Sequence, residues 1–445
     1  MLKQFKNFYK KSPSKPFNEE DTPDWQNELK RKKWSVFLSI TFGYGFYYVC
    51  RLSFNVIKKP LVDAGIFDAS ELGLIGSGLF FAYAFGKLTN GILADRVNVR
   101  RFMATGLFIS AIANLMLSFT NWFWFFVIIW TINGWFQSFG APASVVSVSQ
   151  WTNQNERGSF YGMWGTSHNI GEAITYIGTA IVVSTFGWMW GFRVAGIVCI
   201  LFSIVIYNYL YERPEVYGLP SPAPTYKKQT KESISAMQWE VFKNPTVWIL
   251  ALSSACFYVT RYAVNSWGIF FLEIEKGYSA VEASSIISIS SVVGIAGTFF
   301  SGILSDKLFK GKRNAPAFIF GIIYACSVTL FVLGPANAIM DTLSMVFFGL
   351  SLGVLIIYLG GLMAVDICSK EVAGTALGIV GVASYLGAAV QDILSGYLIE
   401  GNKTIENGKE VYNFDQVGML WIGASIVSLL LAALVWNVKP NVKQQ

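Results

Sequence analysis

Long apolar stretches alternate with shorter polar stretches along almost the whole chain. A helix rises 1.5 Å per residue, so about 20 apolar residues cross the ~30 Å hydrocarbon core of a bilayer. Twelve stretches have this length, which predicts an all-α membrane protein with twelve transmembrane helices. The predicted spans are residues 34–57, 72–94, 102–120, 122–146, 158–186, 190–211, 246–272, 281–305, 315–334, 339–366, 372–399 and 415–437.

A polar stretch with five prolines, residues 212–245, separates the sixth predicted span from the seventh. It divides the spans into two groups of six. The predicted organisation is a cytoplasmic N-terminal tail (1–33), an N-terminal six-helix half (34–211), a cytoplasmic linker (212–245), a C-terminal six-helix half (246–437) and a cytoplasmic C-terminal tail (438–445).

The composition agrees with a membrane protein. Hydrophobic residues make up 53% of the 445 residues and charged residues only 14%, whereas soluble domains carry about 25% charged residues. A chain of this kind is not disordered, and its few charges disfavour a soluble enzyme of two or three domains.

Basic residues are distributed unevenly between the two sides of the predicted helix bundle. With both termini on one side, that side holds 25 of the 34 Lys and Arg residues. Five lysines fall in the loops of the other side, namely Lys58, Lys59, Lys276, Lys403 and Lys409. Because basic residues accumulate on the cytoplasmic side, both termini are expected in the cytoplasm. The net charge of +7 therefore reflects topology and does not indicate a nucleic-acid partner.

Several kinds of chemistry lack the residues that they need. The chain has a single histidine, His168, and its five cysteines form no Cys-x-x-Cys pair, so no zinc site is expected. The nearest approach to a nucleotide-binding loop, Gly86-Lys87-Leu88, lacks the other residues of that motif. We expect a protein that is not an enzyme and that uses no metal and no cofactor.

The two halves repeat each other in sequence. Tyr48-x-x-Arg51 returns as Tyr258-x-x-Arg261, residues 91–95 return as 302–306, and three glycines within 158–171 return with the same spacing within 374–387. The offsets are 210, 211 and 216 residues, which predicts two pseudo-symmetric halves in the same orientation. Parallel repeats of this kind place a substrate site at their interface, near the middle of the membrane.

Arg51 and Arg261 lie inside predicted spans, where a charge costs about 2.5–3.5 kcal/mol on insertion scales. Their equivalent positions would place them on opposite walls of one cavity, where they repel each other unless an anion lies between them. Guanidinium groups bind phosphate oxygens two at a time. The pair therefore indicates a phosphate site, and the alternative is that each arginine extends to the outer interface.

Four further ionisable residues within the spans are candidates for the site: Lys87, His168, Glu172 and Asp392. Glu172 follows His168 by four residues and shares its helical face, so the two predict a polar stripe facing a wet cavity or another charge. Lys87 could instead extend to the cytoplasmic interface. His168 could be a satisfied core residue, and Asp392 could pair with a neighbouring helix.

The loop after the second span, Gly91-x-x-x-Asp95-Arg96-x-x-x-Arg100-Arg101, resembles the loop signature of the major facilitator superfamily. Gly302-x-x-x-Asp306-Lys307 resembles its second copy, one half-length later. In that superfamily the loop is a gate element at the cytoplasmic surface. The resemblance therefore implies the major facilitator fold, with gating roles for Asp95, Arg96, Arg100 and Asp306.

A more specific resemblance covers nearly the whole chain. The motifs that carry it are Tyr48-x-x-Arg51, Tyr83-x-x-Gly86-Lys87, Asn133–Ser138 with Pro142, Glu156-Arg157-Gly158, Ser167–Gly171 and Tyr258-x-x-Arg261-Tyr262. Together they resemble the organophosphate:phosphate antiporters. The resemblance implies exchange of an external organic phosphate for internal inorganic phosphate by rocking of the two halves. It also implies that Arg51 and Arg261 bind the phosphoryl group, with Lys87 and His168 in the same site.

The resemblance does not identify the ester. Glu172 departs from the glycerol-3-phosphate type of the family, which has glycine there, and a carboxylate accepts hydrogen bonds from hydroxyl groups. This favours a hexose phosphate such as glucose 6-phosphate over glycerol 3-phosphate. Further residues expected to line the pocket are Gln137, Asn169, Asp392, Tyr48 and Tyr358, although any one aromatic residue could serve helix packing instead.

Several alternatives stay open on the sequence alone. A transporter-like sensor of sugar phosphates would carry the same arginines, and a glycerol-3-phosphate antiporter would differ mainly in its pocket. A proton-coupled exporter of organic cations is disfavoured by the paired arginines, and an intramembrane hydrolase by the absence of a nucleophile motif. We expect a monomer in a bacterial inner membrane, whose partners are the phosphate ester, inorganic phosphate and lipid, and whose transport is obligatory exchange.

Overall fold

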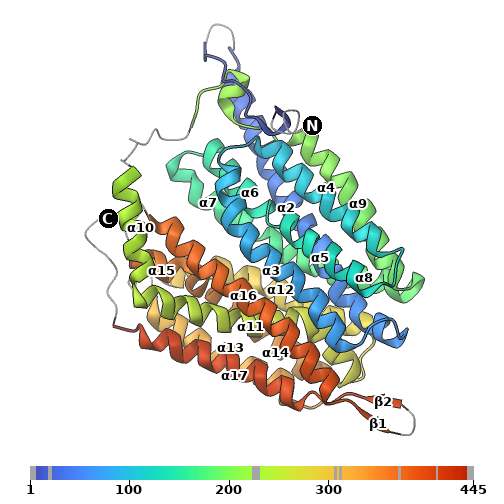
Figure 1. Ribbon diagram of the computed structural model, residues 1–445. Coiled ribbons are helices and arrows are strands. Elements are labelled where there is room, and N and C mark those ends of the chain that lie inside the picture. The colour runs from blue at the N-terminus through green and yellow to red at the C-terminus, as the bar shows by residue number, and fades with distance from the viewer. Residues whose placement is uncertain are drawn as a thin grey trace.

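The computed structural model describes residues 7–18, 23–222, 231–304, 308–309, 313–368, 372–406 and 409–437. Most of this part of the chain is helical (Figure 1). The helices of the first half are α2 (Trp25–Asp63), α3 (Ala69–Ala94), α4 (Val99–Leu117), α5 (Phe123–Gln137), α6 (Gly140–Trp151), α7 (Gln154–Gly165), α8 (Ser167–Phe186) and α9 (Trp188–Tyr209).

A short helix η1 (Pro214–Tyr217) and α10 (Lys231–Lys243) lie between the halves in sequence. The second half contains α11 (Pro245–Ile274), α12 (Ala280–Ile303), α13 (Asn314–Leu333), α14 (Ala338–Ile357), η3 (Tyr358–Leu362), α15 (Met363–Asp366), α16 (Ala373–Gly401) and α17 (Asp415–Leu434). Strands β1 (Thr404–Glu406) and β2 (Lys409–Val411) form an antiparallel hairpin between α16 and α17.

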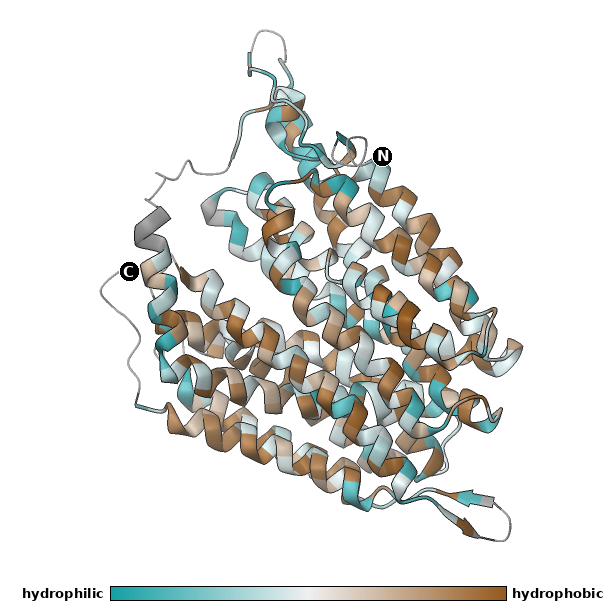
Figure 2. Ribbon diagram, viewed as in Figure 1, coloured by the Kyte–Doolittle hydropathy of each residue, from teal (hydrophilic) through white to brown (hydrophobic). Residues whose placement is uncertain are grey.

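The helices coincide with the predicted spans. In the described part of the chain, eight helical segments are each long and apolar enough to cross a membrane. Three predicted spans are built from consecutive helices, since 122–146 corresponds to α5 and α6, 158–186 to α7 and α8, and 339–366 to α14, η3 and α15. Figure 2 shows apolar residues along most of the helical surface, with hydrophilic residues gathered at the helix ends and on the N-terminal segment.

Helix α2 is longer than the predicted span 34–57 at both ends. At its start it includes charged residues that were assigned to the tail. At its end it continues through Pro60 to Asp63, so Lys58 lies inside the helix and its side chain is fully buried. The placement of Lys58 in a loop is therefore wrong, because hydropathy marks where apolar residues stop and a helix can continue with buried polar residues.

The two ends of the helix bundle are called the terminal side and the hairpin side. The N-terminal segment (residues 7–18) and η1 lie on the terminal side, and the β1–β2 hairpin lies on the hairpin side (Figure 1). Three helix pairs join the two halves, namely α3 with α16, α8 with α12, and α2 with α11.

Glycine allows α3 and α16 to meet almost backbone to backbone on the hairpin side. A Cβ atom on Gly73 would lie 2.4 Å from the carbonyl oxygen of Asp392, and one on Gly396 would lie 2.4 Å from that of Ala69. The backbone N–H of Ala69 also donates to Glu400 Oε2 at 3.1 Å. Toward the terminal side the ribbons of the two halves diverge (Figure 1), so the halves are in closest contact on the hairpin side.

Candidate binding site between the two halves

Arg51 on α2 and Arg261 on α11 occupy equivalent positions of the two halves. Arg51 lies twelve residues before the end of its helix and Arg261 thirteen, which places each roughly 18–20 Å from the hairpin-side helix end. Arg51 is only 3% exposed to solvent and Arg261 only 2%. Both guanidinium carbons lie 5.4 Å from the centroid of the Tyr262 ring, so the two groups share one aromatic neighbour.

Aromatic rings surround the Arg51 guanidinium. Its Nη2 donates to Tyr262 Oη at 2.8 Å. Its central carbon lies 4.9–5.6 Å from the rings of Tyr48, Phe80, Tyr83, Tyr262 and Tyr385. Cation–π contacts stabilise a buried cation without neutralising it, and no carboxylate in the described part of the chain lies within ion-pair distance of Arg51. This group therefore keeps a full positive charge in the bundle interior.

Arg261 has a weak carboxylate partner. Its Nη2 lies 3.4 Å from Glu172 Oε1, which also accepts from Asn265 Nδ2 at 3.3 Å. Ser291 Oγ donates to Glu172 Oε2 at 2.9 Å. Charge-assisted hydrogen bonds are typically 2.7–2.9 Å long, so the Arg261–Glu172 contact is loose. Glu172 belongs to the first half and all three of its donors to the second, and among the described residues its ion-pair partner is Arg261.

The remaining residues predicted on α8 also face the region between the halves. The His168 ring lies 5.9 Å from the Tyr48 ring, and its Nε2 is buried without a hydrogen-bond partner in the described part of the chain. Asn169 is buried, and a Cβ on Gly294 of α12 would lie 3.5 Å from its Oδ1. The structure thus brings His168, Asn169 and Glu172 to the surface between α8 and the second half.

Lys87 extends toward the second half from the terminal side of the arginines. Its Nζ lies 5.3 Å from the centroid of the Tyr385 ring, and a Cβ on Gly381 would lie 2.6 Å from it. The Tyr385 ring also lies 4.4 Å from that of Tyr83 and contacts Arg51. Tyr385 therefore connects Lys87 with the arginine cluster.

Asp392 lies in a separate cluster, nearer the hairpin side. Its Oδ1 is 3.2 Å from Lys58 Nζ and accepts hydrogen bonds from Ser266 Oγ at 2.7 Å and Trp267 Nε1 at 2.6 Å. Lys58 Nζ also donates to Ser266 at 2.8 Å and lies 3.6 Å from the centroid of the Trp267 ring. A Cβ on Gly76 would lie 1.8 Å from Asp392 Oδ2. Because Lys58 belongs to the first half and Asp392 to the second, this buried ion pair joins the two halves.

Two predicted pocket residues do not contact the arginines in the described structure. Gln137 is buried at the end of α5, and its Nε2 has no hydrogen-bond partner among the described residues. Tyr358 lies in η3, and its hydroxyl donates to the carbonyl oxygen of Ser301 at 2.5 Å.

The predicted gating loop lies between α3 and α4, on the terminal side. The Asp95 carbonyl oxygen accepts from Lys11 Nζ at 2.5 Å, and Arg96 is exposed. Arg100 donates to the carbonyl oxygen of Tyr207 and stacks 4.7 Å from its ring. Asp306, the fourth predicted gating residue, lies outside the described residues.

Sequence reasoning missed several neighbours of the arginines. Asn55 Nδ2 donates to the carbonyl oxygen of Asn265 at 2.9 Å, which joins equivalent positions of the two halves. Extending the repeat by four residues would have found this pair, since Tyr-x-x-Arg-x-x-x-Asn is present in both copies. Lys58 follows Arg51 by seven residues and shares its helical face. Tyr262 belongs to a family motif, but its bond to Arg51 does not follow from the sequence. No spacing in the sequence indicates Tyr385.

The arginine cluster is suited to a small dianion. The Nε atoms of Arg51 and Arg261 are both buried without a hydrogen-bond partner in the described part of the chain. Buried donors of this kind are costly unless they are paired. Phosphate oxygens can accept from several guanidinium N–H groups at once, so one phosphoryl group between the halves would satisfy donors from both.

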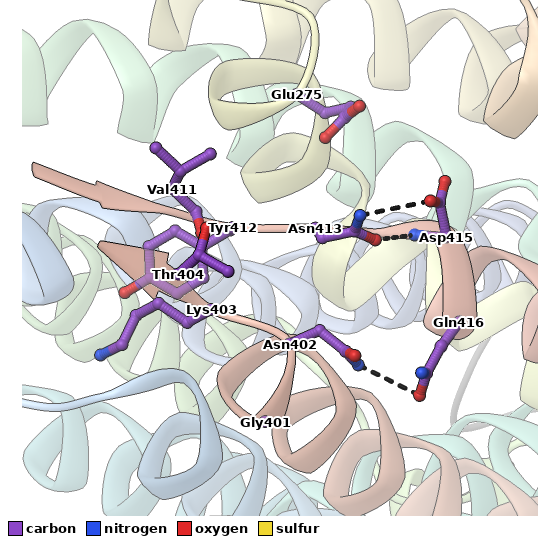
Figure 3. A pocket seen from close by; sticks show the side chains of 10 residues that line it. All are labelled: Glu275, Gly401, Asn402, Lys403, Thr404, Val411, Tyr412, Asn413, Asp415 and Gln416. Atoms are coloured by element: carbon purple, nitrogen blue, oxygen red, sulfur yellow. Dashed lines mark hydrogen bonds between the residues drawn. The ribbon is translucent and has the colours of Figure 1, made fainter. Parts of the chain in front are cut away.

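A different cavity, of about 700 Å³, lies beside the hairpin (Figure 3). Its polar side chains largely bond to one another, since Asn402 Nδ2 donates to Gln416 Oε1 at 3.2 Å and Asn413 Nδ2 to Asp415 Oδ2 at 3.2 Å. Glu275 and Asp415 on its wall would repel an anion. It contains none of the residues of the arginine cluster.

Comparison with known proteins gives a family match. The family model described as Major Facilitator Superfamily matches residues 37–391, which is 355 of the 445 residues. A bacterial homologue of the human lysosomal transporter Spinster, solved in an inward-facing and unoccupied conformation, has the same fold. Its TM-score is 0.73 at 15% identity, with 92% of this chain and 97% of that chain covered.

Curated relatives at 32% identity carry three different names. One is a probable hexose phosphate transport protein of Chlamydia pneumoniae, with 92% of both chains covered. Another is the glycerol-3-phosphate transporter of Bacillus subtilis, with 92% of this chain and 93% of the relative covered. The third is the membrane sensor protein UhpC of Salmonella typhimurium, with 80% of this chain and 83% of the relative covered.

A first testable prediction concerns the contribution of the Lys58–Asp392 pair to stability. Replacing Lys58 by Met, or Asp392 by Leu, leaves an uncompensated buried charge and should lower the free energy of unfolding by about 3–5 kcal/mol. The double replacement should recover most of that loss. Unfolding of the purified protein in mixed detergent measures the effect.

The neighbouring lysine provides the matched control. Lys59 pairs with Asp63 at 2.5 Å on the exposed side of α2, so Lys59→Met should cost at most about 1 kcal/mol. If Lys58→Met is as mild as Lys59→Met, the buried pair does not hold the halves together.

Proposed function

The chain belongs to the Major Facilitator Superfamily and, within it, to the organophosphate:phosphate antiporter family, and from this membership we propose that it exchanges a hexose phosphate for inorganic phosphate by alternating access. The observation that carries the proposal is the arginine cluster. Two guanidinium groups, one from each half, lie buried near the middle of the bundle and share the Tyr262 ring.

The charges of the cluster match a phosphate dianion. Arg51, Arg261 and Lys87 contribute three positive charges and Glu172 one negative charge, a balance of two positive charges. A phosphate monoester carries about −1.5 to −2 at pH 7. A bound phosphoryl group would therefore neutralise the cluster, whereas an organic cation would raise its charge. This supports an anion as the substrate and argues against an exporter of cations.

Contacts between the halves explain how one site could control both sides. Arg51 of the first half bonds Tyr262 of the second, and Glu172 of the first half contacts Arg261 of the second. A phosphoryl group held by both arginines would replace the loose Glu172 contact and draw the halves together. Reorientation would then be fast when an anion is bound and slow without one, which makes obligatory exchange the expected mode. The partial pairing of Arg261 with Glu172 reduces the electrostatic repulsion between the two guanidinium groups that the sequence predicts. Arg51 still carries an unpaired positive charge.

Glu172 is the residue proposed to select the ester. It accepts from Arg261, Asn265 and Ser291, while a carboxylate offers about four acceptor positions. One position is therefore open to a substrate hydroxyl. A hexose phosphate has several hydroxyls at the distance of a sugar ring from the phosphate, and glycerol 3-phosphate has fewer, so the hexose ester is favoured.

The distribution of the basic residues supports the proposed membrane orientation. Their excess on the terminal side favours a cytoplasmic location for both termini, and burial of Lys58 removes one basic residue from the opposite loops. The bacterial relatives support a bacterial inner membrane. A sugar-phosphate sensor stays the main alternative, supported by the relative named as a membrane sensor.

The arginine pair yields a transport prediction. In proteoliposomes loaded with inorganic phosphate, Arg51→Lys and Arg261→Lys should each lower the uptake of labelled phosphate by at least about tenfold. Lysine keeps the charge but loses the fork of N–H donors, and a hydrogen bond to a charged group is worth about 1.5–3 kcal/mol. Liposomes without internal phosphate should show little uptake.

Arg193→Lys is the matched control, because Arg193 lies near the start of α9 and is partly exposed beside Phe119 and Trp190. Near-normal exchange by both cluster variants would refute the phosphate clamp. Rapid net uptake into phosphate-free liposomes would refute obligatory exchange, and phosphate binding without any flux would favour the sensor.

A third prediction concerns Glu172. Glu172→Gln and Glu172→Ala should reduce the preference for glucose 6-phosphate over glycerol 3-phosphate as inhibitors of phosphate exchange, because a site built to bond a hydroxyl discriminates through that bond. Phosphate self-exchange should change little, and the exposed Glu240→Gln should change neither. Unchanged selectivity, or loss of self-exchange, would assign Glu172 to a structural ion pair with Arg261.

A further inference from the structure

A hollow of about 700 Å³ lies on the terminal side of the first half, away from the arginine cluster. Its walls come from α3, α4, α5 and the N-terminal segment. The volume is within the range of pockets that hold small organic ligands, about 300–1,000 Å³. Nothing in the proposed exchange mechanism uses this hollow.

The deep part of the hollow is apolar. It is lined by Phe102 and Ile109 of α4, by Trp135 and Phe136 at the end of α5, and by Phe139 just before α6. Phe102, Thr105 and Ile109 recur at positions i, i+3 and i+7, so one face of α4 forms a continuous wall. From Phe102 to Ile109 this wall rises about 10 Å, roughly a third of the ~30 Å hydrocarbon core.

The N-terminal segment closes the side of the hollow. The Tyr9 carbonyl oxygen accepts from the Asn98 backbone N–H at 2.9 Å, and the Tyr9 side chain bonds to Thr105. Lys11 Nζ donates to the Asp95 carbonyl oxygen at 2.5 Å. These bonds attach the segment to the loop between α3 and α4, so the hollow has a defined shape.

The mouth of the hollow is basic. Lys10 and Arg96 both line it, and both are exposed. Within the described part of the chain neither forms an ion pair, and no acidic side chain lines the hollow. The cavity beside the hairpin differs, since Glu275 and Asp415 line it. Two uncompensated cations above an apolar wall match a ligand with an anionic head and a hydrocarbon body.

We propose that this hollow binds an anionic phospholipid from the leaflet on the terminal side. The lipid phosphate would lie between Lys10 and Arg96, and one acyl chain would follow α4 toward Ile109. A soluble anion would need the basic mouth but not the apolar wall of about 10 Å, and a zwitterionic lipid would leave the two cations less well neutralised. The bound lipid would bridge the N-terminal segment and the gating loop that carries Arg96.

Native mass spectrometry of the detergent-solubilised protein tests the proposal. The probes are phosphatidylglycerol and phosphatidylcholine with identical acyl chains. The parent should retain one phosphatidylglycerol at low lipid excess and bind phosphatidylcholine about tenfold or more weakly. Lys10→Gln/Arg96→Gln should weaken phosphatidylglycerol binding by roughly 10- to 30-fold, since each basic residue near a membrane surface contributes about 1 kcal/mol.

A second variant tests the apolar wall without changing charge. Ile109→Trp should fill the hollow and abolish the tightly bound lipid, whereas Phe108→Trp, on the exposed neighbouring position, should not. Lys30→Gln/Arg31→Gln removes two exposed basic residues elsewhere on the terminal side and should also leave binding intact. Equal binding of both lipids by the parent, or unchanged phosphatidylglycerol binding in both hollow variants, would overturn the proposal.

Discussion

Two positive charges near the middle of a membrane are the constraint on which this structure depends. Placing a cation there costs free energy on every membrane-insertion scale, and the fold offsets this cost in two different ways. Arg51 lies among five aromatic rings that stabilise its charge without cancelling it, and Arg261 has a loosely held carboxylate, Glu172. Both solutions leave guanidinium N–H groups for a ligand, whereas a tight salt bridge would not.

The same constraint explains why the contacts cross between the halves. Tyr262 bonds Arg51 from the opposite half, and Glu172 reaches Arg261 in the same way. Nearer the hairpin side, Lys58 and Asp392 form a second buried pair. Asp392 Oδ1 accepts from Lys58, Ser266 and Trp267, while its Oδ2 has no hydrogen-bond partner among the described residues. The bundle thus has two layers of charged groups between the halves, the first formed by Lys58 and Asp392 and the second by the arginines with their unpaired Nε donors. An anion that bonds both arginines would act on the second layer and change how the halves meet.

Much of this was predictable from the sequence, for identifiable reasons. Hydropathy finds membrane helices because an apolar stretch must match the bilayer, and the internal repeat paired Arg51 with Arg261. Individual partners were harder to predict. The contact of Glu172 on α8 with Arg261 on α11 depends on how the two halves pack, and no spacing within one helix encodes it. Lys58 was assigned to a loop because hydropathy falls there, although the helix continues and buries it.

The most direct test of the account is an experimental structure of the purified protein with a bound hexose phosphate. The account predicts that phosphoryl oxygens lie within hydrogen-bond distance of both Arg51 and Arg261, between the halves. It also predicts that Glu172 has moved from Arg261 toward a sugar hydroxyl. A phosphoryl group bound outside this cluster, or contacting only one of the two arginines, would contradict the claim that the pair forms one phosphate site.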